Sequence, residues 1–287
     1  MVKHISKKPV FLVGCPRSGT TLLQSLLAAH SQIAGFPESH LFFYLVPETP
    51  NRRFLGIASR RVKSRLHKFL GTELNRPEVL SEFSPMTLFM GQYAKKFVKI
   101  MDSLTEERRK NLWLEKTPDH VFYVEYIEKF LPGVRFIHII RNGRDVVASM
   151  YELAKKYPKI WGVQSDVDAC IDKWMRAVAA SQKHLDKPNH IMVKYEDLVG
   201  DTQAQLAKLC DFIGVEFEES MLENYGDTAN NVSLNNEPWK QDVSRRIEKA
   251  NSPKFERLFD ESERQYILER VGRINLEDSI FKINCVK

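Results

Sequence analysis

The sequence has few cysteines, and their spacing builds no recognisable site. The 287 residues include four, at Cys15, Cys170, Cys210 and Cys285. No C-x-x-C pair or other metal-ligand spacing occurs, which argues against a metal centre. Residues 1–8 lack the long apolar region of a signal peptide, and no apolar run approaches the ~20 residues needed to span a bilayer. We therefore expect a reduced, cytoplasmic protein without a transmembrane segment.

Chain length and the order of apolar segments indicate one α/β domain spanning 1–287. With 43% hydrophobic residues, the chain can bury one large core. Short apolar segments alternate with stretches of helical spacing, which favours a mainly parallel central sheet flanked by helices. The expected strands are Val10–Val13, Leu112–Leu114, Arg135–Ile140 and Ile191–Tyr195. A helical, basic insertion is expected at about 50–110, and the least regular segment is expected at 227–242.

A glycine-rich turn follows the first expected strand. Gly14 and Gly19 bound the turn, and helical spacing begins at Thr20 and Thr21. A strand, a glycine turn and a helix N-terminus together form an anion site, because free backbone N–H groups point into the turn. The spacing matches the Walker A loop, but Thr20 replaces its lysine and the cation is Arg17. The turn is therefore expected to bind a phosphorylated nucleotide other than a triphosphate; a purely structural turn is the alternative.

An arginine and a serine follow the expected strand Arg135–Ile140. Arg141 offers a fixed fork of donors to a phosphate group, and Ser149 adds a hydroxyl in the next helix. Gly143 permits the intervening turn, and Asp145 suits the first turn of a helix. Alone, an arginine after a strand is more often a salt-bridge partner than a ligand. Together with the glycine turn, it favours a second phosphate site.

These two segments resemble the sulfotransferases that use 3′-phosphoadenosine 5′-phosphosulfate (PAPS). Residues 16–21 are similar to the family's 5′-phosphosulfate loop, and 141–149 to its 3′-phosphate element. The resemblance implies a P-loop-type three-layer fold, PAPS as co-substrate with no metal, and transfer of a sulfuryl group to a hydroxyl or amine. The nucleotide-binding residues that it implies here are Arg17, Ser18, Gly19, Thr20, Thr21, Arg141 and Ser149.

Two later segments are also similar to the family. Tyr195 begins a Tyr-Glu-Asp-Leu stretch like the one that flanks the nucleotide, although a half-buried core tyrosine is the alternative. Trp239-Lys240 resembles the Trp-Lys pair of a late loop, so Lys240 is a further candidate ligand. The Arg-Lys-Gly motif of cytosolic members is absent, and Leu-Asn-Asn at 234–236 stands nearby instead.

The resemblance also suggests which residues carry the chemistry. Cytosolic members have a Lys-Thr-His run whose histidine is the base, whereas this chain reads Lys-Thr-Pro at 116–118. Glu38 lies 21 positions after Arg17 (38 − 17), like the catalytic glutamate of tyrosylprotein-type enzymes. We expect Glu38 as the base, with Lys116 and Arg17 stabilising the departing phosphate. His40 and His120 are alternative bases, and a purely structural role for Glu38 stays open.

The sequence restricts the acceptor less than it restricts the nucleotide. Residues 51–70 contain seven cations and no acid, whereas the whole chain has a net charge of +6. This segment fits a solvated helix face, a docking surface for an acidic acceptor, or a contact with anionic lipid. The aromatic stretch Phe36–Tyr44 suits an aromatic acceptor. No recognition motif for nucleic acid accompanies the charge, so no nucleic-acid partner is expected. The sequence leaves the oligomeric state open.

Two other functions remain as alternatives. The first is a P-loop kinase for a small molecule, which the missing Walker lysine disfavours. The second is a non-catalytic module that binds adenosine bisphosphate or docks a partner through the basic segment. Such a module would not need Glu38 and Lys116 to meet at the glycine turn.

Overall fold

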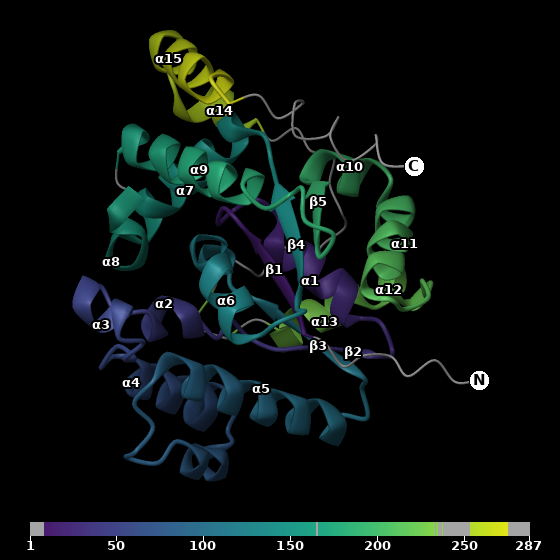
Figure 1. Ribbon diagram of the computed structural model, residues 1–287. Helices are drawn as coiled ribbons and strands as arrows, with labels where there is room; N and C mark the ends of the chain where they lie inside the picture. The colour runs from purple at the N-terminus through teal and green to yellow at the C-terminus, as the bar shows by residue number, and fades with distance from the viewer. Residues whose placement is uncertain (1–8, 165, 233, 235–236, 238–252, 275–287) are drawn as a thin grey trace.

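The computed structural model describes residues 9–164, 166–232, 234, 237 and 253–274. Its centre is a five-stranded sheet in which all neighbouring strands are parallel, in the order β2-β3-β1-β4-β5 (Figure 1). The strands are β1 (Val10–Gly14), β2 (Ile33–Gly35), β3 (Leu112–Lys116), β4 (Arg135–Ile140) and β5 (His190–Lys194). The predicted α/β class with a parallel sheet is confirmed. The sequence analysis missed β2, because three residues are too few to display a strand periodicity.

Helices and helical turns connect the strands and follow the last one. They are α1 (Thr20–Ala28), α2 (Leu41–Leu45), α3 (Pro50–Phe54), α4 (Val62–Leu66), a π-helix (His67–Glu73), a 3₁₀ turn (Pro77–Glu82), α5 (Met90–Glu107), a 3₁₀ turn (Pro118–Tyr123), α6 (Val124–Phe130), α7 (Gly143–Lys156), α8 (Pro158–Trp161), a 3₁₀ turn (Gly162–Gln164), α9 (Val167–Gln182), α10 (Tyr195–Gly200), α11 (Thr202–Ile213), α12 (Ser220–Glu223), α13 (Tyr225–Val232), α14 (Lys254–Leu258) and α15 (Glu261–Gly272).

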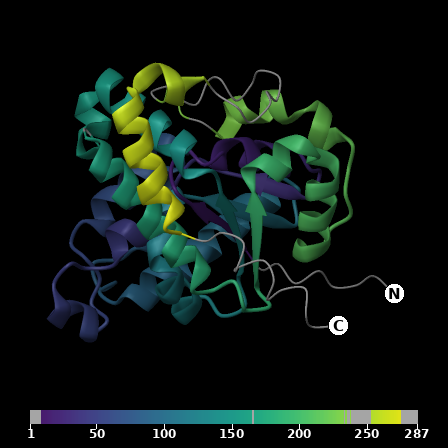
Figure 2. The ribbon, with the colours of Figure 1, turned by 90° about the horizontal axis from the view of Figure 1, so that it is seen from above.

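The sheet separates two apolar cores. Side chains alternate between the two faces of a strand. In β1, Val10 and Leu12 pack against α1, α11 and α12, whereas Phe11 and Val13 pack in the core with α5, α6, α7 and α9. Figure 2 shows the green helices on one side of the sheet and the teal and yellow helices on the other. This three-layer arrangement brings the carboxyl ends of the parallel strands to one edge, where ligands bind in open α/β sheets.

Two features of the fold differ from the expectations. The segment 227–242 was predicted as irregular, but its first residues continue helix α13, which packs against α1. The apolar side chains of Ala229 and Val232 are buried there, so packing outweighs the poor helix propensity of the asparagines. The basic segment 51–70 was predicted as one helix-like stretch, but it is divided among α3, α4 and a π-helix. Within the described residues, no helix is long and apolar enough to cross a membrane.

Candidate active site

The glycine turn lies at the carboxyl end of the central strand β1. A Cβ atom on Gly14 would lie 2.4 Å from the carbonyl oxygen of Ile139, so β4 approaches too closely for any side chain. Gly19 has φ +92°, and a Cβ atom there would lie 2.3 Å from the ring of Tyr195. Only glycine fits both positions without displacement. Helix α1 begins directly after the turn, at Thr20, so its free N–H groups face the turn.

The second phosphate element lies at the end of β4, beside the first. Asn142 caps helix α7 by accepting a hydrogen bond from the backbone N–H of Arg144 (3.1 Å). The guanidinium of Arg141 lies over the ring of Tyr195, 4.3 Å from its centroid. Trp174 donates a hydrogen bond to the backbone oxygen of Arg141 (3.0 Å). Tyr195 therefore lies between the glycine turn and the arginine that follows β4.

Tertiary contacts join the two elements and leave polar atoms for a ligand. Arg17 Nε donates a hydrogen bond to Ser149 Oγ at 3.1 Å. Among the residues that the structure describes, the buried atoms Ser18 Oγ and Arg141 Nε have no hydrogen-bond partner. A buried donor without a partner is costly, so both fit contacts to a bound group. These two atoms belong to the two elements that the hydrogen bond between Arg17 and Ser149 joins.

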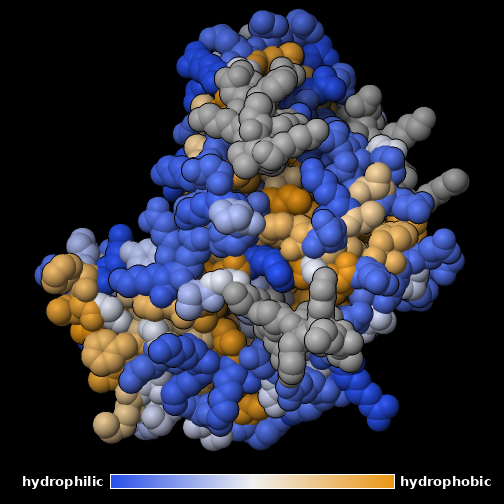
Figure 3. Space-filling model, turned by 45° about the vertical axis from the view of Figure 1, so that its right-hand side comes forward, coloured by the Kyte–Doolittle hydropathy of each residue, from blue (hydrophilic) through white to orange (hydrophobic). Residues whose placement is uncertain are grey.

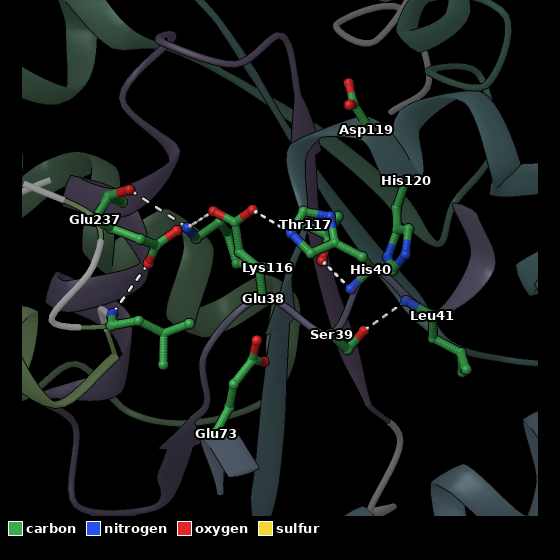
Figure 4. Close-up of polar contacts among 12 residues, drawn as sticks. Glu38, Ser39, His40, Leu41, Glu73, Lys116, Thr117, Asp119, His120 and Glu237 are labelled. Carbon is green, nitrogen blue, oxygen red and sulfur yellow. Dashed lines mark hydrogen bonds and ion pairs between the residues drawn. The ribbon is translucent and has the colours of Figure 1, made fainter. Parts of the chain in front are cut away.

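A buried ion pair lies next to the glycine turn. Lys116 Nζ lies 2.5 Å from Glu38 Oε1 and 3.4 Å from Thr21 Oγ1. Only 1% of the Lys116 side chain and 12% of the Glu38 side chain are exposed. His40 Nε2 contacts the other carboxylate oxygen of Glu38 at 3.3 Å. Figure 4 shows Lys116 and His40 on opposite sides of that carboxylate. The arrangement brings a carboxylate, a cation and the first turn of α1 together.

A buried carboxylate organises the backbone that carries Glu38. Glu115 Oε1 accepts hydrogen bonds from the Ser39 hydroxyl (2.6 Å), the Ser39 backbone N–H (3.2 Å) and the Thr117 hydroxyl (2.8 Å). Glu115 Oε2 lies 3.0 Å from His120 Nδ1. Burial opposes the ionisation of Glu115, but His120 and these hydrogen bonds outweigh it and hold its pKa below the ordinary value. The ionised carboxylate thus fixes the position of Ser39.

The two candidate histidines have different surroundings. His120 is fully buried, and its Nε2 accepts a hydrogen bond from the backbone N–H of Phe42 (3.2 Å) while Nδ1 faces Glu115. Both ring nitrogens are therefore used within the fold. His40 is partly exposed and has φ +49°, an uncommon conformation outside glycine. Burial lowers the pKa of His40, and the neighbouring Glu38 opposes that shift. His40 thus lies next to the Glu38 carboxylate, and His120 does not.

The insertion contributes a buried arginine that holds Glu38 from its backbone. Arg65 donates to the carbonyl oxygens of Ser39 (2.7 Å) and Glu38 (2.6 Å). Its guanidinium also forms two hydrogen bonds to Glu73, at 2.9 and 2.7 Å. Both side chains are nearly inaccessible, with 7% and 6% exposure. Arg65 is one of the seven cations in residues 51–70, for which the sequence predicted a solvated or docking surface, but it lies inside the molecule and contacts the backbone of Glu38.

Not all candidate residues can be placed. The structure brings together Arg17, Ser18, Gly19, Thr20, Thr21, Glu38, Lys116, Arg141, Ser149 and Tyr195. Lys240 lies outside the described residues. Sequence reasoning missed Glu115, Arg65 and Glu73. Glu115 could have been found, because an acid is unusual within an apolar strand such as β3. The residues around Arg65 and Glu73 give no such indication. Within the described residues, no cluster of His, Cys, Asp or Glu could hold a metal ion.

Most of this chain is similar in sequence to known proteins. The profile of the sulfotransferase family matches residues 9–219. Omega-hydroxy-beta-dihydromenaquinone-9 sulfotransferase Stf3 of Mycobacterium bovis is 27% identical over 75% of this chain and 65% of its own length. Protein-tyrosine sulfotransferase A of Caenorhabditis elegans is 24% identical over 79% of this chain and 55% of its own length. The chain thus spans less than two thirds of these relatives.

Solved structures share the fold. The sulfotransferase domain of the Synechococcus PCC 7002 olefin synthase has a TM-score of 0.62 and 22% identity, covering 94% of this chain and 97% of that domain. The mouse sulfotransferase SULT7A1, in a crystal structure with PAP, has a TM-score of 0.51 and 15% identity, covering 97% of this chain and 88% of its own. At these identities the likeness establishes the three-layer architecture.

Proposed function

The chain belongs to the sulfotransferase family, and we propose from this premise that it transfers a sulfuryl group from PAPS to an acceptor hydroxyl or amine by in-line displacement. The observation that carries the proposal is the buried Lys116–Glu38 pair, held next to the first turn of α1. A protein that only bound a nucleotide would not need a carboxylate and a cation at that place. A kinase loop would carry a lysine where Thr20 stands.

The proposed nucleotide contacts come from three strand ends. The backbone N–H groups at Gly19, Thr20 and Thr21, with the side chains of Arg17 and Ser18, hold the 5′ phosphosulfate end. Arg141 and Ser149 hold the 3′ phosphate, and Arg17 is linked to Ser149 by the 3.1 Å hydrogen bond. Tyr195 packs between Gly19 and Arg141 and fixes the distance between the two phosphate sites. Lys240 is proposed as a further contact from its sequence match alone.

The proposed chemistry uses the carboxylate and the cations. PAPS, when bound, supplies the sulfuryl group. Glu38 takes the proton of the acceptor hydroxyl while the acceptor oxygen bonds to sulfur and the bond from sulfur to the phosphate oxygen breaks. Lys116 and Arg17 stabilise the charge that develops on the departing phosphate oxygen. Lys116 contacts both Glu38 and Thr21, so it lies between the base and the nucleotide turn. His40, next to Glu38, is the alternative base.

For the acceptor we propose only a chemical class, and for the compartment only the cytoplasm. The names of two relatives describe sulfation of a menaquinone derivative and of protein tyrosine. Here the aromatic side chains around α2 and the cations of the insertion favour an acceptor that is aromatic or acidic. We place the reaction in the cytoplasm on the sequence analysis alone.

A transfer assay tests the proposal. Purified protein is incubated with PAPS labelled in the sulfuryl group and with phenols, hydroxylated prenyl lipids, tyrosine peptides and glycans as acceptors. The expected result is a labelled product from at least one acceptor class, formed about 10²–10⁴ times more slowly by Glu38→Gln. A protein that binds adenosine 3′,5′-bisphosphate but labels no acceptor, and whose Glu38→Gln variant behaves like wild type, would contradict the enzyme and favour the binding module.

A further inference from the structure

Large exposed apolar side chains are concentrated on the insertion between β2 and β3. Of ten such residues in the described part of the chain, five lie between positions 54 and 89. They are Phe54 (91% exposed), Leu55 (59%), Met86 (81%), Leu88 (56%) and Phe89 (48%). Isolated apolar residues on a surface are ordinary, whereas a gathered set marks an interaction site. We refer to these five residues as the insertion patch.

Backbone contacts bring the two halves of the insertion patch together. Ile57 and Phe89 form an antiparallel bridge. The backbone N–H of Ala58 donates to the oxygen of Leu88 (2.8 Å), and that of Met90 donates to the oxygen of Gly56 (2.8 Å). The turn that follows α3 is thus paired with the segment that precedes α5. Figure 3 shows apolar side chains gathered at the lower left, on the side of the molecule where α3 and α4 lie.

Arginines flank the insertion patch. Arg52 and Arg53 lie in α3, directly before Phe54, and Arg60 and Arg61 follow the turn. Arg53 donates to the backbone oxygens of Pro47 and Glu48, which fixes its side chain but leaves its positive charge. Residues 51–70 contain no acid, and the nearby acid Glu48 pairs with Arg61 at 2.9 Å. The patch therefore combines projecting apolar side chains with a local excess of positive charge.

We propose that the insertion patch binds the surface of an anionic lipid bilayer. Phe54, the last residue of α3, and Leu55, in the turn that follows, enter the acyl boundary, while the flanking arginines meet anionic headgroups. An acidic protein partner would account for the arginines. It would not account for Phe54, which projects almost fully into solvent rather than lining a hollow. The bilayer is the one occupant that matches both the charge and the projecting side chains.

Arg61, which flanks the insertion patch, links it to the helix that begins at the candidate active site. The guanidinium of Arg61 lies over the rings of Phe43 (5.8 Å) and Tyr44 (5.6 Å), both in α2. Helix α2 begins directly after His40, which contacts Glu38. A docked bilayer would therefore present a lipid acceptor near the base. That consequence rests on the proposed function, whereas binding to the bilayer does not.

Vesicle flotation tests the proposal with the full chain. Phosphatidylcholine vesicles are compared with vesicles that also contain phosphatidylglycerol, at low and high salt. We expect binding to the anionic vesicles, weakened by salt. The double variant Phe54→Ser/Leu55→Ser should bind them about tenfold or more weakly, because two apolar side chains no longer leave water. The double variant Arg60→Glu/Arg61→Glu should lose the preference for phosphatidylglycerol.

Matched controls keep the test decisive. Leu268→Ser, on α15, removes a side chain that is 42% exposed outside the insertion and should leave vesicle binding unchanged. The thermal shift caused by adenosine 3′,5′-bisphosphate confirms that each variant is folded and tests the nucleotide site separately. The proposal is wrong if the wild type does not bind anionic vesicles or if Phe54→Ser/Leu55→Ser binds them as tightly as the wild type. Binding of polyglutamate in place of vesicles, sensitive only to the arginine variant, would identify an acidic protein partner instead.

Discussion

The Nε atom of Arg17 donates a hydrogen bond to the hydroxyl of Ser149 at 3.1 Å, across 132 positions of the chain. Arg17 belongs to the glycine turn after β1, and Ser149 belongs to α7, which follows β4. Because β1 and β4 are parallel neighbours, their carboxyl ends lie side by side and the two elements form one site. A ligand with two phosphate groups can therefore contact both elements at once, which leads to the first two predictions.

The site should distinguish a bisphosphate from a triphosphate. Adenosine 3′,5′-bisphosphate at a hundredfold excess over its dissociation constant should stabilise the fold by about 2.7 kcal/mol. For a chain of this size, the melting temperature should then rise by about 5–10 °C. Mg-ATP should have a much smaller effect, because Thr20 replaces the Walker lysine. Thermal denaturation with each nucleotide measures the difference. Equal stabilisation by Mg-ATP would favour the kinase.

Arg141 should recognise only the 3′ phosphate. Arg141→Ala removes a charged donor worth about 1.5–3 kcal/mol, so affinity for adenosine 3′,5′-bisphosphate should fall about 10- to 150-fold. Affinity for adenosine 5′-monophosphate, which lacks that phosphate, should hardly change. Calorimetric titration of both nucleotides into both proteins provides the comparison. A parallel loss for the two nucleotides would mean that Arg141 supports the fold through its contact with Tyr195.

Glu38 should be needed for turnover but not for nucleotide binding. Glu38→Gln keeps the shape of the side chain and removes its basicity, so kcat should fall by about 10²–10⁴. The dissociation constant of adenosine 3′,5′-bisphosphate should stay within about twofold of wild type. Glu48→Gln, on the exposed surface, is the matched control and should retain activity. Near-normal turnover of Glu38→Gln, with His40→Ala inactive, would assign the base to His40.

Arg65 should act on catalysis through the backbone of Glu38. Arg65→Lys keeps the charge but cannot donate to Glu38, Ser39 and Glu73 together. A carboxylate displaced by about 1 Å should lower kcat roughly 10- to 100-fold. Bisphosphate affinity should be unchanged, because the glycine turn keeps its contacts. Arg60→Lys, an exposed substitution in the same segment, is the control. Unchanged kcat in Arg65→Lys would show that Glu115 and Ser39 hold Glu38 without it.

A buried histidine chain should make the fold sensitive to acid. His138 Nδ1 lies 3.0 Å from Ser181 Oγ, and His138 Nε2 lies 2.9 Å from His190 Nδ1. His190 Nε2 in turn lies 3.1 Å from Glu128 Oε1. Burial lowers the pKa of His190 from 6.5 to about 4, although Glu128 opposes the shift. Burial would raise the pKa of Glu128, but hydrogen bonds from Lys187, His190 and Asn189 lower it from 4.5 to about 2.

Both folded-state pKa values lie below their unfolded values, so both groups stabilise the fold above those values and lose that contribution on acidification. For His190 the loss should run from about pH 6.5 to pH 4, and for Glu128 from about pH 4.5 to pH 2. Urea denaturation should show the free energy of unfolding falling by about 1–3 kcal/mol in the first window. His190→Gln should flatten that slope, whereas His67→Gln, on the surface, should not. A slope unchanged by His190→Gln would assign the effect to other groups.

Local sequence determined the framework of this protein. Apolar runs placed four of the five strands, because a strand buried on both faces reads as a continuous apolar segment. The turn Gly14–Gly19 could be predicted from its two glycines. Glycine is required at both positions because Ile139 and Tyr195 approach the backbone closely. Arg141 and Ser149 were recognised by their position after a strand. The roles of these residues in binding and transfer stay proposals.

Tertiary structure alone decided how the candidate base is held. Arg65 stood in a stretch of seven cations, and its neighbours gave no sign that it would be buried against Glu73 and the backbone of Glu38. Likewise, Glu115 is recognisable as an unusual acid in a strand, but its partner Ser39 lies 76 positions away along the chain. A buried charge is stable only when partners surround it, and partners distant in sequence meet only when the sheet and insertion have formed. The same folding leaves the side chain of Phe54 91% exposed to solvent.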